Sequence, residues 1–288
     1  MEINGKTMIC GLIGNPVEHT LSPMIHNTLA ELSGQNMVYV PFPVEKGKLA
    51  QAVAGAVAFN LLGLNVTVPY KSEVINYLCE IDELAQNIGA VNTLVKAEGG
   101  YKGYNTDMEG LYRALISEGI KIDGEQIILL GAGGAARAVA YLCAVKGANK
   151  IYMLNRTLNK AQTVAEEVNR ASSREVIVPM AVEDHVKIPD GKYLAIQATS
   201  VGLSPHIEDT VISDEVFYDK VHTGFDLIYN PWETKFMRLV KEHGGKAYNG
   251  LKMLLYQGII AYELWNDVSI SEENAMVVYG KLKGTIRE

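Results

Sequence analysis

Cysteine, long apolar runs and basic charge are all scarce in this chain, and each shortage argues against a class of protein. The three cysteines, Cys10, Cys79 and Cys143, lie far apart and form no CxxC pair, which argues against a disulfide framework and thiol redox chemistry. No apolar run approaches the ~20 residues that a membrane-spanning helix needs. The formal net charge is −7 without a basic cluster, so we expect no binding to nucleic acid or to an anionic membrane.

Metal-binding and export signals are also missing. The six histidines show no HExxH or other recognised ligand spacing, so we expect no metal site. The opening segment "MEINGKTMICGLIG" carries an acidic residue and lacks a basic region followed by a cleavage site. We therefore expect a cytoplasmic protein.

The length of 288 residues predicts about two domains. Short apolar runs alternate with amphipathic stretches in the N-terminal part, and the same strand–helix rhythm restarts after residue 125. Residues 107–119 have helical spacing, with Asp107 as the expected N-cap and Gly119 as the expected stop. We predict an α/β fold with two domains, over residues 1–106 plus 250–288 and over residues 107–249. The C-terminal segment contains two helical patterns and no strand, so we expect it to pack back on the first domain.

A glycine-rich turn follows the apolar strand "IILL" and precedes an alanine-rich helix, and it fits the dinucleotide-binding pattern G-x-G-x-x-G/A. The first glycine permits a tight turn, the second lets the backbone approach a pyrophosphate, and the small Ala136 lets helix and strand pack closely. The free N–H groups of the helix N-terminus attract phosphate. The second domain is thus predicted to be a Rossmann-type domain, and its turn residues are Gly131, Ala132, Gly133, Gly134 and Ala135.

The end of the next strand indicates which dinucleotide is bound. An NAD-binding domain usually has an acidic residue there for the ribose 2′-hydroxyl, but this chain has Asn155 and Arg156. A carboxylate would repel a 2′-phosphate, whereas a guanidinium can hydrogen-bond it and stack on the adenine. Lys160, about one helical turn later, supplies a second cation. NADP is therefore favoured over NAD.

Polar residues gather where the apolar strands of the first domain end, and ligands of open α/β sheets bind at the carboxyl ends of strands. The segment "NVTVPYK" at residues 65–71 is predicted to be a buried strand that ends on Lys71. Taken singly, these residues have structural explanations, such as an N-cap role for Ser22. Taken together, they suit a small polyhydroxylated acid. The group comprises Ser22, Asn65, Thr67, Lys71, Asn92, Thr93, Asn105, Thr106 and Asp107.

The motifs of this chain resemble those of the shikimate dehydrogenases, which reduce 3-dehydroshikimate to shikimate with NADPH in chorismate and aromatic amino-acid biosynthesis. The resemblance runs nearly end to end and keeps the family's motif order. The motifs are "GNPVEHTLSPMIHN", "NVTVPYK", "GAVNT", "GYNTD", "GAGGAARA", "NRT", "ATSVG", "DLIYNP" and "NGLKMLLYQG".

The resemblance implies a role for most of these residues. Lys71 and Asp107 correspond to the family's catalytic pair. The carboxylate-binding groups correspond to Thr20, Ser22 and Tyr229, where many members have serine in place of Thr20. The hydroxyl-binding groups correspond to Asn65, Thr67, Asn92, Asp107 and Gln257, with Lys71 also touching the substrate.

On the cofactor side, the resemblance implies an NADP-selective turn and a nicotinamide-lining segment. The turn corresponds to Asn155, Arg156 and Thr157, with Lys160 where some members have arginine. The segment lining the nicotinamide corresponds to Thr199, Ser200 and Gly202, and Gly250 and Met253 are expected to approach the nicotinamide as well.

Two alternatives remain open at this stage. One is a quinate/shikimate dehydrogenase that uses NAD or both cofactors, which Arg156 disfavours. The other is a non-catalytic sensor of a shikimate-like acid, which the presence of both Lys71 and Asp107 disfavours. Both a monomer and a homodimer fit the sequence.

Overall fold

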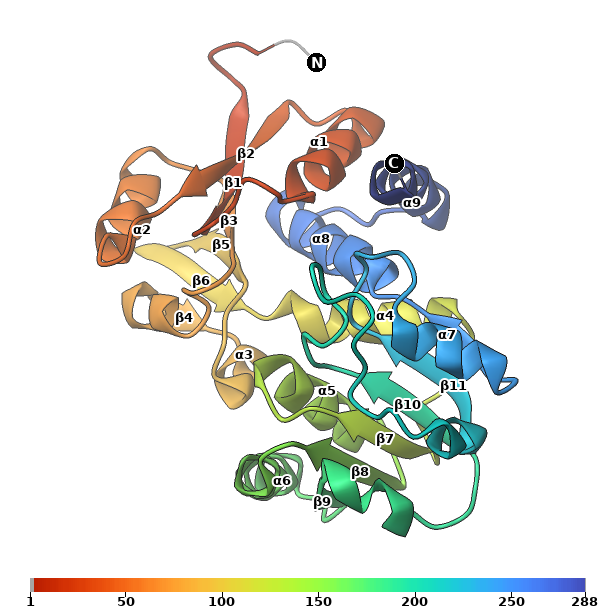
Figure 1. Ribbon diagram of the computed structural model, residues 1–288. Helices are drawn as coiled ribbons and strands as arrows, with labels where there is room; N and C mark the ends of the chain where they lie inside the picture. Colours follow the sequence, from red (N-terminus) through yellow and green to blue (C-terminus); the bar gives the residue numbers. More distant parts are fainter. Residues whose placement is uncertain (1–2, 288) are drawn as a thin grey trace. The chain divides into compact units, whose positions relative to one another are not determined.

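The structure, a computed structural model, describes residues 3–287 (Figure 1). The chain forms two compact units. Unit 1 takes the chain up to Gly110 together with Leu254–Thr285, and unit 2 takes Leu111–Met253 and the short remainder from Ile286. The predicted domain boundaries, after residues 106 and 249, each precede the observed divisions by four residues.

Unit 1 is built on a mixed six-stranded sheet with the order β2-β1-β3-β5-β6-β4. The first three strands run parallel, β5 runs antiparallel to β3 and β6, and β4 is parallel to β6. The strands are β1 (Met8–Gly14), β2 (Met37–Pro43), β3 (Gly63–Val66), β4 (Glu80–Ile81), β5 (Thr93–Ala97) and β6 (Gly100–Tyr104). The helices that lie wholly or mainly in unit 1 are α1 (Ser22–Ser33), α2 (Leu49–Ala58), η1 (Glu73–Tyr77), α3 (Glu83–Ile88), α8 (Leu251–Asn266) and α9 (Glu272–Arg287). Helix α4 (Thr106–Ser117) begins in unit 1 and continues into unit 2 after Gly110.

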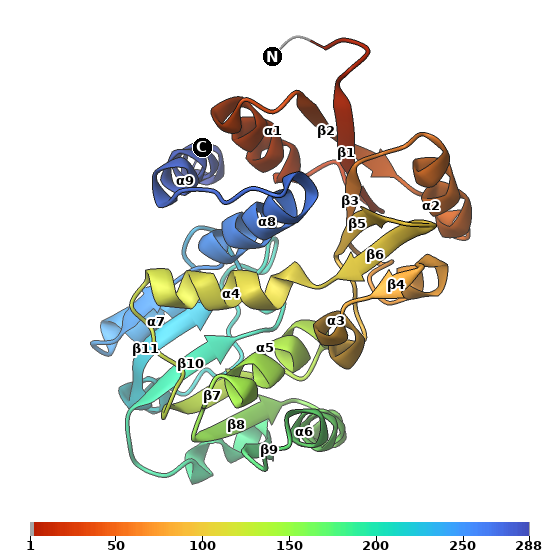
Figure 2. The ribbon, with the colours of Figure 1, turned by 180° about the vertical axis from the view of Figure 1, so that it is seen from behind.

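The sheet of unit 1 has a different environment on each face (Figure 2). Leu64 and Val66 of β3 join the apolar core under α2, which lies across the sheet from α1 and α8. Side chains alternate along a strand, so Gly63 and Asn65 point to the opposite face. A Cβ atom at Gly63 would stand 2.1 Å from the indole nitrogen of Trp265, so glycine lets α8 pack closely there. This alternation places the Asn65 amide on the face of the sheet that α1 and α8 cover.

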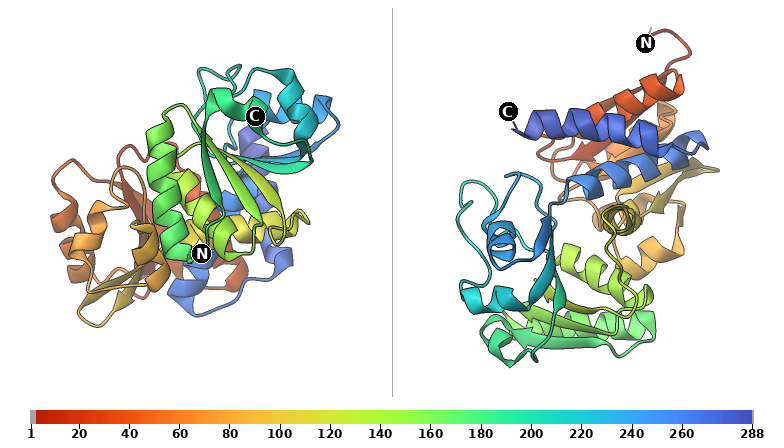
Figure 3. Two further views of the ribbon diagram at one scale, coloured as in Figure 1. Left: turned by 90° about the horizontal axis from the view of Figure 1, so that it is seen from below. Right: turned by 90° about the vertical axis from the view of Figure 1, so that its right-hand side faces the viewer.

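The C-terminal helices α8 and α9 pack beside α1, as the sequence predicted (Figure 3, right). The Tyr262 hydroxyl on α8 lies 2.6 Å from the Ser33 hydroxyl at the end of α1. Trp265 donates its indole N–H to the Leu94 carbonyl of β5 at 2.9 Å, and Lys281 of α9 donates to the Thr28 hydroxyl at 3.4 Å. These contacts return the chain to unit 1 after it has formed unit 2.

Two local predictions in unit 1 were wrong. The strand predicted over residues 65–71 ends at Val66, because Pro69 has no N–H for the ladder and the Tyr70 N–H closes a turn on the Thr67 carbonyl at 2.9 Å. Lys71 therefore lies beyond a turn and not on the strand. Asp107 is also not the N-cap of α4: Asn105 accepts the Asp107 N–H at 3.2 Å and takes that role. The Asp107 carboxylate is thereby left for another partner.

Unit 2 is a Rossmann-type domain. Its six strands are all parallel, in the order β12-β11-β10-β7-β8-β9, and helices cover both faces (Figure 3, left). The strands are β7 (Gln126–Leu130), β8 (Lys150–Asn155), β9 (Ile177–Ala181), β10 (Tyr193–Gln197), β11 (Val221–Asp226) and β12 (Lys246–Tyr248). The helices are α5 (Gly134–Val145), α6 (Leu158–Ser172), η2 (Val182–Lys187), η3 (Glu215–Lys220) and α7 (Lys235–Glu242).

Candidate active site

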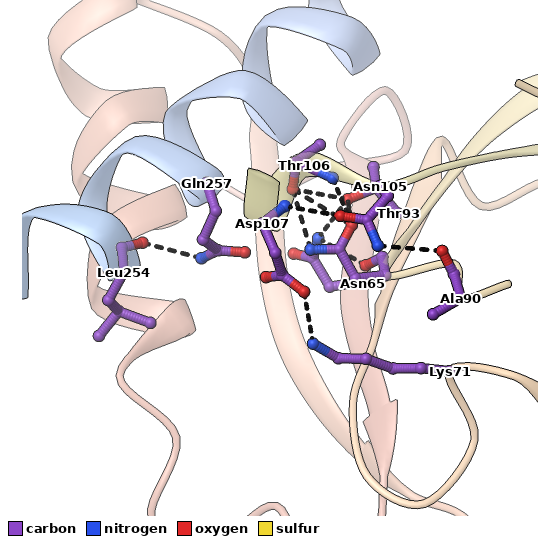
Figure 4. Close-up of polar contacts among 10 residues, drawn as sticks. Asn65, Lys71, Ala90, Thr93, Asn105, Thr106, Asp107, Leu254 and Gln257 are labelled. Atoms are coloured by element: carbon purple, nitrogen blue, oxygen red, sulfur yellow. Dashed lines mark hydrogen bonds and ion pairs between the residues drawn. The ribbon is translucent and has the colours of Figure 1, made fainter. Parts of the chain in front are cut away.

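Lys71 and Asp107 form an ion pair in unit 1 (Figure 4). The Lys71 Nζ lies 2.7 Å from Asp107 Oδ2, and the two side chains keep 34% and 23% of their surface exposed. The Lys71 carbonyl accepts the Val91 N–H at 2.8 Å, which ties the turn after β3 to the segment before β5. Asp107 stands in the first turn of α4, where the helix dipole favours a negative charge. The fold thus holds a cation and an anion together at a solvent-accessible position.

A buried hydrogen-bond network lies beside this pair and contains Asn65, Asn92, Thr93 and Thr106. Asn92 Oδ1 accepts the Thr106 N–H at 2.8 Å and the Thr93 hydroxyl at 3.1 Å. Its Nδ2 donates to the Thr106 hydroxyl at 3.0 Å. A backbone N–H can only donate, so the Asn92 amide has one possible orientation. Its oxygen is fully engaged within the protein, and one N–H of its Nδ2 remains for a ligand.

The Asn65 amide also has one possible orientation, but here the nitrogen, and not the oxygen, bonds to the network. Its Nδ2 donates to the Asn92 carbonyl at 3.2 Å and to the Thr93 hydroxyl at 3.1 Å. Since a carbonyl can only accept, the nitrogen must face it, and both N–H groups are then used. Asn65 therefore offers a ligand only its oxygen, whereas Asn92 offers a donor.

Thr20 and Ser22, the residues expected to bind a carboxylate, form a small hydroxyl pair. The Thr20 hydroxyl donates to the Ser22 hydroxyl at 3.1 Å and accepts the Ser22 N–H at 3.2 Å. Ser22 is the first residue of α1 and Leu21 holds the N-cap position without a side-chain bond, so the N-cap explanation for Ser22 does not hold. Two hydroxyls at the N-terminus of a 12-residue helix suit a carboxylate.

Thr67 and Gln257 are the other predicted substrate residues of unit 1. Thr67 follows β3 directly and donates its N–H to the Ile13 carbonyl at 2.9 Å. Gln257 donates from Nε2 to the Leu254 carbonyl at 2.8 Å, and its amide oxygen points toward the side of Asp107 (Figure 4). A Cβ atom at Gly110 would stand 2.7 Å from the Gln257 backbone nitrogen, so glycine lets α4 and α8 approach each other there.

The glycine-rich turn of unit 2 joins β7 to α5 as predicted. Gly131 has a φ of +116°, and its Cβ would stand 2.9 Å from the Thr199 side chain, so the turn itself requires glycine there. A Cβ atom at Gly133 or Gly134 would meet nothing within 4 Å. Packing inside the protein therefore does not require these two glycines, and the absence of side chains leaves the backbone open to a ligand such as the predicted pyrophosphate. Gly133 caps α5 without a side-chain bond, and no acidic residue lies in the first turn.

The turn predicted to be NADP-selective lies at the end of β8. Asn155 Nδ2 donates to the Thr157 carbonyl at 2.9 Å and closes the turn, while Arg156 and Lys160 are exposed. Among residues 3–287, Arg156 has no ion-pair partner. Helix α6 carries Lys160 and no acid in its first turn, although a helix N-terminus disfavours cations. An anion such as a 2′-phosphate would relieve this excess of positive charge.

The predicted nicotinamide-lining segment is organised by Gln197, which the sequence reasoning missed. The Gln197 amide oxygen accepts the Thr199 N–H at 2.7 Å and the Thr199 hydroxyl at 2.6 Å, and its nitrogen donates to the Val201 carbonyl at 3.0 Å. Ser200 is exposed, and Gly202 has a φ of +100°. Gln197 thereby fixes the course of residues 198–202.

Asp226 is a second buried polar residue that the sequence reasoning missed. It is fully buried at the end of β11, accepting from the Thr234 hydroxyl at 2.6 Å and from the Ile228 N–H at 3.0 Å. Burial raises the pKa of Asp226 to about 6, against the effect of these donors. The carboxylate holds the loop that carries Tyr229, a half-buried residue whose own pKa is raised by burial.

Gly250 and Met253 belong to unit 2: Gly250 directly precedes α8, and Met253 lies in the first turn of that helix. Gly250 donates its N–H to the Ile228 carbonyl at 3.1 Å, and a Cβ atom there would stand 2.1 Å from the Leu227 carbonyl oxygen. Met253 is half-buried. Unit 1 thus contains every predicted substrate residue except Tyr229, and unit 2 contains Tyr229 and all the predicted cofactor residues.

Residues 3–287 contain no group of three or more His, Cys, Asp or Glu side chains arranged to hold a metal ion. None of the helices in this described part of the chain is both long and apolar enough to cross a membrane.

Comparison with known proteins connects this geometry to a family. Residues 12–94 match the family described as "Shikimate dehydrogenase substrate binding domain", and residues 114–187 match "Shikimate / quinate 5-dehydrogenase". The shikimate dehydrogenase (NADP(+)) of Desulforamulus reducens is 43% identical over 265 residues, covering 91% of each chain.

Solved structures agree in fold along almost the whole chain. A shikimate dehydrogenase in complex with NADP⁺ has a TM-score of 0.88 and 38% identity, covering 98% of this chain and 97% of that one. The Listeria monocytogenes shikimate 5-dehydrogenase, in complex with shikimate and NAD, has a TM-score of 0.88 and 31% identity, covering 98% of each chain. The chain belongs to the shikimate dehydrogenase family.

Proposed function

We propose that this protein catalyses the reversible NADPH-dependent reduction of 3-dehydroshikimate to shikimate, a step of chorismate and aromatic amino-acid biosynthesis. The observation that carries the proposal is the Lys71–Asp107 ion pair at 2.7 Å beside the oriented amides of Asn65 and Asn92. An acid–base group and a set of fixed donors and acceptors for ring hydroxyls are what the interconversion of a ketone and an alcohol on a polyhydroxylated ring requires.

Lys71 is proposed as the proton donor and acceptor. NADPH, when bound, supplies the hydride for ketone reduction. Negative charge then develops on the substrate oxygen, where the Lys71 ammonium can stabilise it and transfer a proton. An ammonium has three N–H donors, and the bond to Asp107 uses one of them, so others are left for the substrate. In the oxidation direction, neutral Lys71 accepts the hydroxyl proton.

Asp107 is proposed to act in two ways. Its Oδ2 accepts from Lys71 and fixes the direction of that side chain, while its second oxygen can accept a hydrogen bond from a ring hydroxyl. The hydroxyls of Thr20 and Ser22, together with Tyr229 of unit 2, are proposed to bind the substrate carboxylate. Thr67 and Gln257 complete the hydroxyl-binding set.

NADP is proposed to bind unit 2 through the residues described above. The glycine-rich turn and the N-terminus of α5 hold the pyrophosphate, and Arg156 with Lys160 holds the 2′-phosphate. Thr157 and the segment with Thr199, Ser200 and Gly202 complete the cofactor residues. No acidic residue follows β8 at the position where NAD-binding Rossmann domains usually have one, so NADP is favoured.

Turnover measurements separate this function from its alternatives. Reduced-nicotinamide absorbance is followed with shikimate or quinate, each with NADP⁺ or NAD⁺. Turnover confined to shikimate with NADP⁺ supports the proposal, and comparable rates with quinate or NAD⁺ support a quinate/shikimate dehydrogenase. Binding of shikimate without turnover in any combination supports a sensor.

The role of Lys71 is tested by Lys71→Ala. We expect kcat to fall ~10²-fold or more while the KM for shikimate stays within about tenfold, because general acid–base help acts mainly in the transition state. Lys102→Ala is the matched control, since Lys102 also pairs with an acid in unit 1, lies 3.6 Å from Glu80 and has a similar side-chain exposure of 33%. Equal turnover in the two variants would rule out the catalytic role of Lys71.

We further propose a cytoplasmic location and a monomer or homodimer that binds neither nucleic acid nor membrane. The acidic net charge of −7 supports the absence of polyanion binding. Light scattering at several protein concentrations distinguishes monomer from dimer.

A further inference from the structure

Tyr39 of β2 contacts Asn65 from the side opposite to the Asn92 carbonyl. Its hydroxyl oxygen lies 2.8 Å from Asn65 Oδ1, in a buried position. The carbonyl of Asn92 fixes the Asn65 nitrogen on its own side, so the atom that faces Tyr39 is an oxygen and the phenol must be the donor. The Tyr39 hydroxyl and the Asn92 carbonyl thus hold the Asn65 carboxamide at both ends.

The position of the Tyr39 phenol is itself fixed by several elements. On the backbone, the Tyr39 N–H donates to Asn27 Oδ1 at 2.8 Å and the Tyr39 carbonyl accepts from Asn27 Nδ2 at 3.0 Å. Since β2 is an edge strand, the Asn27 amide of α1 replaces the neighbouring strand that these groups lack. The ring stacks on His26 with centroids 4.2 Å apart, and Trp265 of α8 lies 6.0 Å away.

We propose that Tyr39 is a positioning residue for substrate binding: it holds the Asn65 carboxamide in the place and orientation in which its oxygen meets a ring hydroxyl. The inference rests on the proposed function of the site, because it takes Asn65 to be a substrate contact. Tyr39 acts through Asn65. Its phenol also interacts with the Ser22 side chain, and the double-mutant cycle below separates that route from the one through Asn65. Removal of the Tyr39 hydroxyl leaves the buried Asn65 oxygen without this donor, so the amide is no longer held in that orientation.

The test compares Tyr39→Phe with Tyr101→Phe. Tyr101 is the matched control, because it is also 1% exposed in unit 1 and also donates a buried hydrogen bond, to the Leu61 carbonyl at 2.9 Å. We expect both variants to lower the urea midpoint by similar amounts. Only Tyr39→Phe should raise the KM for shikimate, by about tenfold, with the KM for NADP⁺ unchanged and kcat within about threefold.

A double-mutant cycle with Asn65→Ala tests whether the effect passes through Asn65. In the Asn65→Ala background, Tyr39→Phe should change the KM for shikimate by less than about twofold, because the side chain that it positions is gone. Equal effects in both backgrounds would overturn the inference, and so would equal KM values in Tyr39→Phe and Tyr101→Phe.

Two further measurements cover the cases in which the wild-type protein is inactive or Tyr39→Phe does not fold. If the wild-type protein does not oxidise shikimate with NADP⁺, the proposed function fails, and the inference fails with it for that separate reason. If Tyr39→Phe does not fold, Asn27→Ala takes its place. This variant keeps the Tyr39 phenol and removes only the two hydrogen bonds between the Asn27 amide and the Tyr39 backbone. The same selective rise in the KM for shikimate supports the inference, and an unchanged KM overturns it.

Discussion

His26 should make unit 1 unstable in acid, because its ring is buried without a partner. The side chain on α1 has no exposed surface, and neither ring nitrogen has a hydrogen-bond partner among residues 3–287. Tyr39, Tyr262 and Trp265 surround the ring at centroid distances of 4.2, 6.4 and 5.0 Å. Burial lowers the pKa of His26 from 6.5 to about 3, and the nearby Asn65 side chain offsets only part of that shift.

The size of the effect follows from linkage. One pKa unit corresponds to about 1.4 kcal/mol, so the neutral ring contributes on the order of 5 kcal/mol to the free energy of unfolding. The folded-state pKa is depressed, so this contribution is complete above pH 6.5 and is lost as the pH falls toward 3. At pH 4 about 3 kcal/mol of it should already be gone.

The measurement is urea unfolding of the wild type and His26→Phe between pH 8 and pH 4. Phe keeps the stacking on Tyr39 but does not titrate, so any packing cost is independent of pH and cancels in the comparison. The chain has two tryptophans, so a Trp232→Phe background lets Trp265 report on unit 1 alone. We expect the stability difference between the two proteins to shift by about 3 kcal/mol in favour of His26→Phe as the pH falls.

The control is His19→Gln, since His19 is exposed in the same unit. The stability difference for His26→Phe should change with pH by more than that for His19→Gln. A difference for His26→Phe that is constant within ~0.5 kcal/mol would refute the reasoning, because it would mean that the folded protein accommodates a protonated His26.

Two further predictions concern unit 2. Arg156→Ala should raise the KM for NADP⁺ by about 10- to 100-fold in steady-state kinetics, since a charge-assisted hydrogen bond contributes roughly 1.5–3 kcal/mol. The control variant Arg170→Ala, near the other end of α6, should leave the KM for NADP⁺ unchanged. Asp226 has the opposite pH dependence to His26, because its pKa is raised from 3.8 to about 6 and its contribution to stability is lost as the pH rises. Relative to Asp226→Asn, the wild type should therefore lose about 2 kcal/mol between pH 4 and pH 7 in urea unfolding, and a constant difference would contradict this.

The features predicted correctly from the sequence are those that depend on residues adjacent in the chain. The glycine-rich turn between a strand and a helix predicted the Rossmann-type unit, because turn geometry and helix N-termini depend on neighbouring residues. The motif "NRT" places Arg156 directly after strand β8 in the same local way, and its role in 2′-phosphate binding stays a prediction. The pairing of Lys71 with Asp107 needed the family resemblance, since no local pattern joins residues 36 positions apart.

The failures arose where two side chains are locally equivalent. Asn105 and Asp107 are both good N-caps, and only the tertiary position of Lys71 decides that Asp107 is used for the ion pair. Gln197 and Asp226 are the last residues of apolar strands, a position where a polar residue is often exposed. Their burial could therefore not be predicted from the sequence. Tyr39 is one aromatic residue in an apolar strand, and nothing nearby in the sequence indicates that its hydroxyl has a partner.

The buried polar groups connect the stability of unit 1 to its proposed chemistry. Leu64 and Val66 of β3 enter the apolar core, and the same alternation places Asn65 among polar groups on the other face. Burial of the Asn65 amide is tolerated because Tyr39, Thr93 and the Asn92 carbonyl satisfy it. These bonds also determine which of its atoms a ligand meets, so a substitution in this network changes folding and substrate affinity together. A rise in KM is therefore informative about this site only when the urea midpoint of the same variant is measured beside it.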